Sequence, residues 1–273
     1  STPYAVVAGN SFVQVASGTY HVLGLEADGS VYAWGLNSSG QLGDNSIVLK
    51  STPVLVVGNH SFIQVAAGGS HSLALKANGS VYAWGSNTSG RLGDNTTISK
   101  SSPVLVSGSH AFIQVAGGTY HSLALKADGS VYAWGYNSNG QLGDSTLVDK
   151  SSPVLVAGNH SFIQVAVSTN FTLGLDAISY HSMAVKSNGQ VYTWGSNILH
   201  GELGDNTVVS KSTPVSISGT YFISDLSGSS LRYSRNVTPG ESISYKASGL
   251  SPNYFGDIPI ASDMTEIIIK YFS

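Results

Sequence analysis

The sequence repeats one long stretch almost unchanged at an interval of 50 residues. It reads "VYAWGLNSSGQLGDNSIVLKSTPVLV" at 31–56, "VYAWGSNTSGRLGDNTTISKSSPVLV" at 81–106 and "VYAWGYNSNGQLGDSTLVDKSSPVLV" at 131–156. A period of this length restricts the fold to a solenoid, a propeller or another array, because so small a unit buries its apolar face only against its neighbours. We divide the repeat into units near 11–60, 61–110, 111–160 and 161–219.

Each unit contains four short runs rich in β-branched and aromatic residues, which strands favour. In the second unit these runs are 62–66, 72–76, 80–85 and 103–108. An Asx-Gly pair separates the second run from the third, and we expect a two-residue hairpin turn with positive φ at both positions. No segment shows a helical apolar period. The sequence therefore predicts an all-β fold, a β-propeller of four-stranded blades.

The stretch "GGSHSLALKANGSVYAWGSNTSGRLGDNT" (68–96) resembles the repeat of the regulator-of-chromosome-condensation family. The matching residues are His71, Ser72, Leu73, Leu75, Gly79, Val81, Trp84, Gly85, Asn87, Gly90, Leu92, Gly93 and Pro103. The resemblance recurs in four units over about residues 2–217 and implies a β-propeller. It also implies two candidate functions, guanine-nucleotide exchange on a small GTPase and chromatin-type binding of a protein partner.

The two ends of the repeat are irregular. Residues 2–9 match 52–59, so they correspond to the last strand of a blade, and a fifth blade completed by the two termini is one arrangement. The fourth unit carries ten extra residues, in an irregular segment near 168–180. Residues 220–273 abandon the repeat, and we expect a small C-terminal β module or a ring-closing segment. Its apolar run at 266–272 requires a covering partner from its own chain or from another subunit.

Charge and composition exclude several classes of function. The net charge is −3, only 10% of residues are charged, and no cysteine is present. A basic surface for nucleic acid and a cysteine-ligated metal site are therefore excluded. No apolar run is long enough for a membrane span. The polar residues are mainly Ser, Thr, Asn and Gly, which favours an extracellular or virion-surface location.

Residues that recur in every unit are expected to be structural. We expect hydrogen-bonded histidines within the blades, tryptophans as core anchors rather than sugar platforms, and aspartates in Asx turns rather than calcium loops. These residues are His21, His71, His121 and His181; His60, His110 and His160; Trp34, Trp84, Trp134 and Trp194; and Asp44, Asp94, Asp144 and Asp205. No nucleophile, metal or cofactor motif is present, so we expect no catalytic residue, no metal and no cofactor.

Residues that differ between units are the candidates for binding. They fall on the connections between strands, where a rigid scaffold displays its recognition groups. The candidates are Tyr20, Tyr120, Tyr136, Tyr180, Leu36, Arg91 and His200. Neutral variation on exposed loops is the alternative.

The leading hypothesis is a non-catalytic binding or structural module on a virion or cell surface, such as a tail-fibre, decoration or adhesin-like component. It would recognise a protein or a glycan through its blade loops and form a homo-oligomer or larger assembly through the C-terminal segment. The alternatives are the nucleotide-exchange or chromatin-type partner binding implied by the family, and a glycan-active enzyme.

Overall fold

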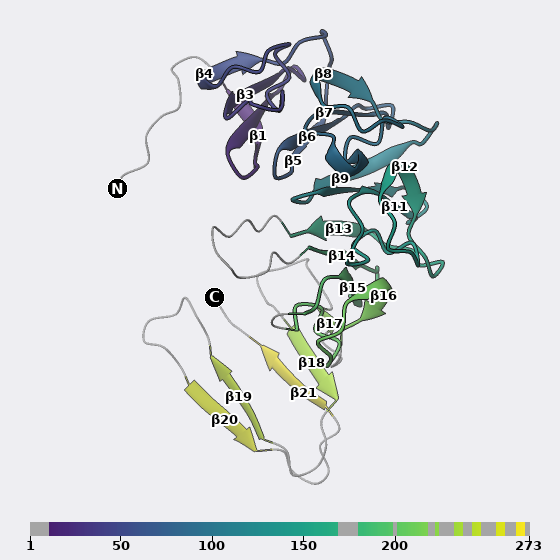
Figure 1. Ribbon diagram of the computed structural model, residues 1–273. Coiled ribbons are helices and arrows are strands. Elements are labelled where there is room, and N and C mark those ends of the chain that lie inside the picture. Colours follow the sequence, from purple (N-terminus) through teal and green to yellow (C-terminus); the bar gives the residue numbers. More distant parts are fainter. Residues whose placement is uncertain are drawn as a thin grey trace. The chain divides into compact units, whose positions relative to one another are not determined.

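A computed structural model of the chain is shown in Figure 1. It describes residues 11–168, 180–198 and 201–217 with their side chains, and beyond these the backbone of the strands between 222 and 270. The irregular segment predicted near 168–180 and the strand predicted at 2–9 lie outside the described residues, apart from Ser168 and Tyr180. The chain divides into two compact units, Ser1–Ser187 with Val191–Ile217 and Asn188–Gln190 with Ser218–Ser273.

The first unit contains four antiparallel sheets of four strands, each in chain order, and confirms the predicted all-β blades. Blade 1 is β1 (Phe12–Ser17), β2 (His21–Glu26), β3 (Val31–Gly35) and β4 (Lys50–Leu55). Blade 2 is β5 (Gln64–Ala67), β6 (His71–Leu75), β7 (Val81–Gly85) and β8 (Lys100–Leu105), with the 3₁₀ turn η1 (Thr88–Gly90). Blade 3 is β9 (Phe112–Gly117), β10 (His121–Lys126), β11 (Val131–Gly135) and β12 (Lys150–Leu155). Blade 4 is β13 (Gln164–Val167), β14 (His181–Val185), β15 (Val191–Gly195) and β16 (Lys211–Ser216).

The hairpin between the second and third strands of each blade differs from the expected turn. In blade 1 Gly29 has φ +88°, but Asp28 is not among the residues with positive φ. Gly29 N–H donates to Glu26 O, and Glu26 N–H donates to Ser30 O. This is a three-residue loop with a type I turn followed by a left-handed glycine. The prediction of two positive φ values was wrong because Asp28 instead accepts the Ser30 N–H at 2.8 Å, which an Asx side chain does in a right-handed turn.

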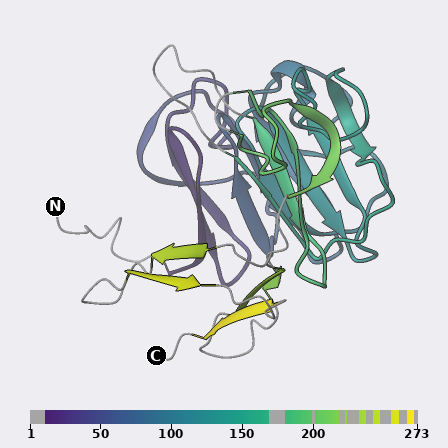
Figure 2. The ribbon, with the colours of Figure 1, turned by 90° about the horizontal axis from the view of Figure 1, so that it is seen from below.

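The blades stack through their first strands. Strand β1 contacts β5, β5 contacts β9, and β9 contacts β13, so these are the inner strands. Figure 1 shows the four sheets of this unit following one another in chain order, and Figure 2 shows them from below. A glutamine on each of β1, β5 and β9 forms two hydrogen bonds with the backbone of the next inner strand. Gln14 Nε2 donates to Val65 O at 3.1 Å, and Gln14 Oε1 accepts from Val65 N at 2.9 Å. The same pair of bonds joins Gln64 to Val115 and Gln114 to Val165.

The hydrophobic core lies between blades rather than within one. One cluster joins Leu23, Val31 and Leu42 of blade 1 to Phe62 and Trp84 of blade 2, and the clusters between later blades use the equivalent residues. The predicted core role of tryptophan is confirmed in blades 2 to 4, where Trp84, Trp134 and Trp194 are fully buried. Each blade therefore depends on its neighbour for its core.

Blade 1 exposes the face that the other blades bury against their predecessor. Val15 is 64% exposed, whereas the equivalent Val65, Val115 and Val165 are buried. Trp34 is likewise only partly buried. Blade 1 also carries Val22 where blades 2 to 4 carry a serine. The first blade thus presents an apolar surface of a different composition from the internal interfaces.

The second unit contains short strands. Strands β17 (Phe222–Ile223), β18 (Arg232–Asn236) and β21 (Glu266–Lys270) form one antiparallel sheet, and β19 (Ser242–Lys246) pairs with β20 (Phe255–Pro259). Strand β21 contains most of the predicted apolar run, and its Ile269 pairs with Tyr233. The run therefore finds a pairing partner within its own chain. Across the described residues of both units, no helix is long and apolar enough to span a membrane.

Candidate functional site at one end of the blades

The repeated histidines join neighbouring blades through a hydrogen-bonded latch. His71 Nε2 lies 2.9 Å from Ser122 Oγ of the next blade, and Ser122 Oγ donates to Arg91 O at 2.9 Å. Trp134 Nε1 donates to the same carbonyl at 2.9 Å. Because the serine gives its proton to the carbonyl, the histidine must donate from Nε2. The same arrangement joins His21 to Ser72 at Gln41 O, and His121 to Ser182 at Gln141 O.

Burial keeps the latch histidines neutral. It lowers the pKa of His21 to about 4 and that of His121 to about 3, in the latter case with help from His181 and Arg91. The pKa of His71 lies well below 6.5 for the same reason, with Arg91, His21 and His121 adding to the effect. A general acid or base requires a pKa near the working pH, so these groups are unsuited to catalysis. The histidine position is structural, as predicted, but its hydrogen bond joins neighbouring blades and does not lie within one blade.

The second histidine position also serves packing, although it hydrogen-bonds less than expected. His60, His110 and His160 precede blades 2, 3 and 4, and each lies 4.4 Å, centroid to centroid, from a tyrosine ring on the third strand of the blade that follows it. Burial, assisted by a neighbouring lysine, lowers the pKa of each. At this position the histidine ring therefore packs against a tyrosine ring, whereas a hydrogen bond within the blade was predicted.

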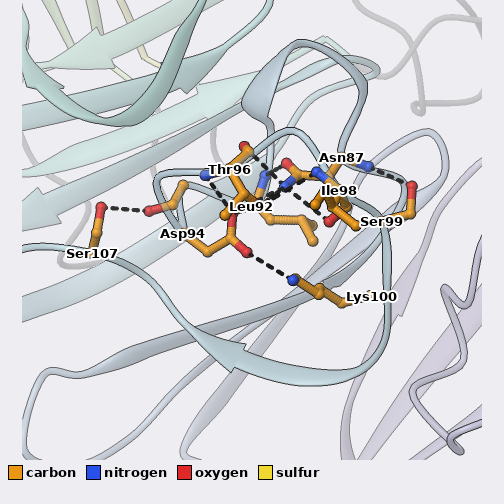
Figure 3. Close-up of polar contacts among 9 residues, drawn as sticks. Asn87, Leu92, Asp94, Thr96, Ile98, Ser99, Lys100 and Ser107 are labelled. Atoms are coloured by element: carbon orange, nitrogen blue, oxygen red, sulfur yellow. Dashed lines mark hydrogen bonds and ion pairs between the residues drawn. The ribbon is translucent and has the colours of Figure 1, made fainter.

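The long loop of each blade is organised around a buried asparagine (Figure 3). Asn87 Nδ2 lies 3.0 Å from Asp94 Oδ1 and 3.1–3.2 Å from the carbonyl oxygens of Thr96 and Ile98, while Asn87 Oδ1 accepts the Leu92 N–H. Asp94 also accepts the Thr96 N–H, which confirms the predicted Asx turn, and its other oxygen lies 3.8 Å from Lys100 Nζ. The asparagine amide therefore occupies the position that a cation would need among these oxygens. Asn37, Asn137 and Asn197 repeat the arrangement.

Four of the predicted binding residues meet at the end of the blades where the second strand begins and the third strand ends. The Tyr120 and Tyr180 rings lie 5.1 Å apart, and Tyr136 lies 6.1 Å from Tyr120 and 5.7 Å from Tyr180, edge-on to both. The Arg91 guanidinium carbon lies 4.6 Å from the Tyr120 ring centroid. We call these four residues the tyrosine–arginine cluster. It combines residues of blades 2, 3 and 4.

The cluster is partly buried and electrostatically unusual. Burial raises the pKa of Tyr180, and its hydrogen bond with Tyr120 adds to this rise. Burial also lowers the pKa of Arg91 to about 10, against the opposing influence of Tyr120, Tyr180 and Asp149. Arg91 nevertheless remains charged at neutral pH. The cluster therefore presents a fixed cation framed by aromatic rings, a combination frequent at the centres of protein interfaces.

The other predicted residues lie elsewhere or outside the described part. Tyr20 and Leu36 belong to blade 1 at the same end of its sheet, where Leu36 N–H donates to Tyr20 O, and Tyr20 is half exposed. His200 lies outside the described residues. The sequence interpretation gave no role to the loop asparagines or to the latch serines. Their signals were present, since an Asn recurs before each loop Asp and a Ser follows each latch His in units 2 to 4.

Several known proteins resemble this chain. Human WBSCR16 matches with a TM-score of 0.68 and 25% identity, covering 80% of this chain and 55% of its own. Yeast RCC1 (Prp20) bound to Kap60 matches with a TM-score of 0.67 and 24% identity, over 80% of this chain and 52% of its own. A second structure of Prp20p, from Saccharomyces cerevisiae, is described with its binding to Gsp1p and histones. It matches with a TM-score of 0.64 and 24% identity, covering 78% of this chain and 52% of its own.

This chain spans about half the length of these solved structures. They share its stacked four-stranded blades, and the family resemblance read from the repeated motif is confirmed. Residues 1–244 match the profile of the RCC1-like domain. The chain therefore belongs to the RCC1-like domain family.

Proposed function

We propose that this chain is a non-catalytic protein-binding module that recognises its partner through the tyrosine–arginine cluster. One observation carries the proposal: tyrosines from two blades meet at one end, although the repeat does not require tyrosine there. Blade 2 has Ser70 and Ser86 at the positions of Tyr120 and Tyr136, and its fold is the same. Tyrosine and arginine are enriched at binding hot spots, and tyrosine buries a large ring with few ordered torsions.

The relatives support the class of function. The yeast structures concern a protein whose named partners are proteins, Kap60, Gsp1p and histones. Partner binding of the exchange-factor or chromatin type is therefore the best supported of the three predicted functions. Display on a virion or cell surface and a glycan ligand gain no support from these relatives.

A peptide selection tests the proposal. A displayed library of random 12-residue peptides is selected on the whole chain, and the binders are measured on a Tyr120→Ser/Tyr136→Ser variant. This variant places in blade 3 the residues that blade 2 already carries, so we expect it to fold. Loss of a hot spot predicts at least about tenfold weaker binding.

The matched control changes the opposite end of the same blade. Asp128→Asn introduces the residue that blade 2 carries at this turn, and binding should be unchanged. Binders that respond to Asp128→Asn and ignore the tyrosine changes would contradict the proposal. Nucleotide exchange is tested separately, by the release of labelled GDP from a small GTPase with and without the chain.

A further inference from the structure

Arg91 carries a buried charge that no described residue neutralises. Its side chain is 5% exposed, and its Nε donates to Thr88 O at 2.9 Å. Among the described residues no carboxylate forms an ion pair with it, and Asp149 acts on it only at longer range. Among the described residues, the Arg91 side chain donates a hydrogen bond only through Nε. Its Nη nitrogens are not enclosed by the protein, so they are accessible to solvent. Buried charges in proteins are normally paired, which makes this arginine an exception.

The loop around Arg91 is rearranged to hold it. In blades 1 and 3 the equivalent Gln41 and Gln141 accept an N–H from the residue two positions earlier, at 2.9 Å. Arginine has no acceptor, so the Thr88–Ser89 peptide presents its carbonyl to Arg91 instead of its N–H. Ser89 consequently adopts φ +67°, a left-handed conformation that is unfavourable for a residue other than glycine. A glutamine would avoid both this backbone conformation and the buried charge.

The rings beside Arg91 restrict what can approach it. Tyr120 covers one face of the guanidinium, and Tyr136 and Tyr180 extend the aromatic surface from there. The Nη hydrogens point along the plane of the guanidinium, where a planar carboxylate accepts two parallel hydrogen bonds. The partly exposed rings of Tyr120 and Tyr136 offer packing surface for the stem of a side chain that carries such a carboxylate. A protein partner presents this combination of groups as an Asp or Glu side chain.

We propose that Arg91 is the anchor for a carboxylate side chain of the protein partner, which it binds through its two Nη nitrogens within the frame of Tyr120, Tyr136 and Tyr180. This inference rests on the proposed function and names the chemistry that its partner must present. The site takes an acidic peptide segment, and the aromatic frame excludes water from the ion pair.

A titration followed by NMR tests the inference without knowledge of the partner. The whole chain, labelled with ¹⁵N, is titrated with the peptide Ac-Gly-Glu-Gly-Glu-Gly-NH2 and with its Gln analogue. We expect a saturable shift of the Arg91 Nε–H signal with the Glu peptide and none with the Gln peptide. The signal staying unmoved at saturating Glu peptide would overturn the inference.

Two variants separate the guanidinium from charge in general. Arg91→Gln restores the side chain that blades 1 and 3 carry, so it should fold, and we expect binding of the Glu peptide to fall at least about tenfold. Arg91→Lys keeps the charge without the planar fork and should also bind about tenfold more weakly. Equal binding by either variant would refute the anchor role. Unchanged thermal unfolding of Arg91→Gln serves as the folding control.

Two further probes examine the class of anion. Inorganic phosphate and a phosphoserine version of the peptide are titrated in the same way, and we expect both to bind more weakly than the Glu peptide. Tighter binding of the phosphopeptide would overturn the carboxylate assignment. If selected peptides need the tyrosines but ignore Arg91→Gln, the proposed function stands and the anchor fails. If the Glu peptide binds through Arg91 but no selected peptide needs the tyrosines, the proposed function fails instead.

Discussion

Acid should unfold this protein through its latch histidines. His21, His71 and His121 are neutral and buried in the folded state, whereas in the unfolded chain each titrates near its ordinary pKa of 6.5. Below pH 6.5 the unfolded chain therefore binds more protons than the folded one, and stability falls as the pH falls. The contribution is fully present above pH 6.5 and is lost progressively toward the folded pKa values, about 4 for His21 and about 3 for His121.

The size of the effect follows from these values. One pKa unit corresponds to about 1.4 kcal/mol, so at pH 5 His21 and His121 each destabilise the fold by roughly 2 kcal/mol relative to pH 7. These two should together remove about 4 kcal/mol of the free energy of unfolding, a large part of the whole stability of many domains, and His71 acts in the same direction. His60, His110, His160 and His181 also have lowered pKa values and act in the same direction, but more weakly because they are less buried.

Urea unfolding at pH 7, 6 and 5 measures the effect, with tryptophan fluorescence as the signal. The control is the triple variant His21→Gln/His71→Gln/His121→Gln, in which an amide N–H can still donate to the latch serine but no group titrates. We expect the wild-type stability to fall by at least about 4 kcal/mol from pH 7 to pH 5 and that of the variant to fall far less. A wild-type loss below about 1 kcal/mol, or equal losses in both proteins, would refute the assignment of neutral buried rings.

Four further predictions concern stability and assembly. Ser122→Val, which introduces the residue that blade 1 has there, leaves a buried histidine N–H unpaired and should lower the free energy of unfolding by about 2–4 kcal/mol in urea titrations. Asn87→Ala removes the centre of its loop and should cost about 3 kcal/mol by the same assay. Val65→Glu should prevent folding by burying a charge, whereas Val15→Glu on the uncovered face should change stability by less than about 1 kcal/mol; circular dichroism distinguishes the two. Removal of residues 220–273 should leave the blades folded but aggregating or in a different oligomeric state, and an unchanged, monodisperse sedimentation profile would contradict this.

The fold could be predicted from the sequence because the repeat supplied an internal comparison. Positions that never change, such as His71 and Trp84, proved to be latch and core groups, and the strands followed the runs rich in β-branched and aromatic residues. The hairpin turn was predicted wrongly because an Asx-Gly pair suits loops of two or three residues, and only the pairing register distinguishes them.

The candidate site was predictable only as a set of separate residues. Tyr120 and Tyr180 stand in different blades, and their contact depends on how blade 4 packs on blade 3. The flipped peptide at Ser89 could not be anticipated either, since it follows from the donor-only chemistry of one side chain in an otherwise repeated loop. Variation between repeats marks candidate positions, and three-dimensional packing decides which of them form a surface.

The latch is asymmetric, and this asymmetry determines where a duplicated blade can be inserted in the chain. Each blade offers a histidine and a carbonyl to its successor and receives a serine and a tryptophan from it, so the two sides of an internal joint are always the same pair of surfaces. A copy of blade 2 or blade 3 inserted after blade 1, 2 or 3 would meet a complementary surface on both sides and could lengthen the array in a single genetic event. A copy placed ahead of blade 1 would bring its histidine against Val22, which has no hydroxyl to receive the proton. Enlargement by gene duplication is therefore open within the array and obstructed at its first blade.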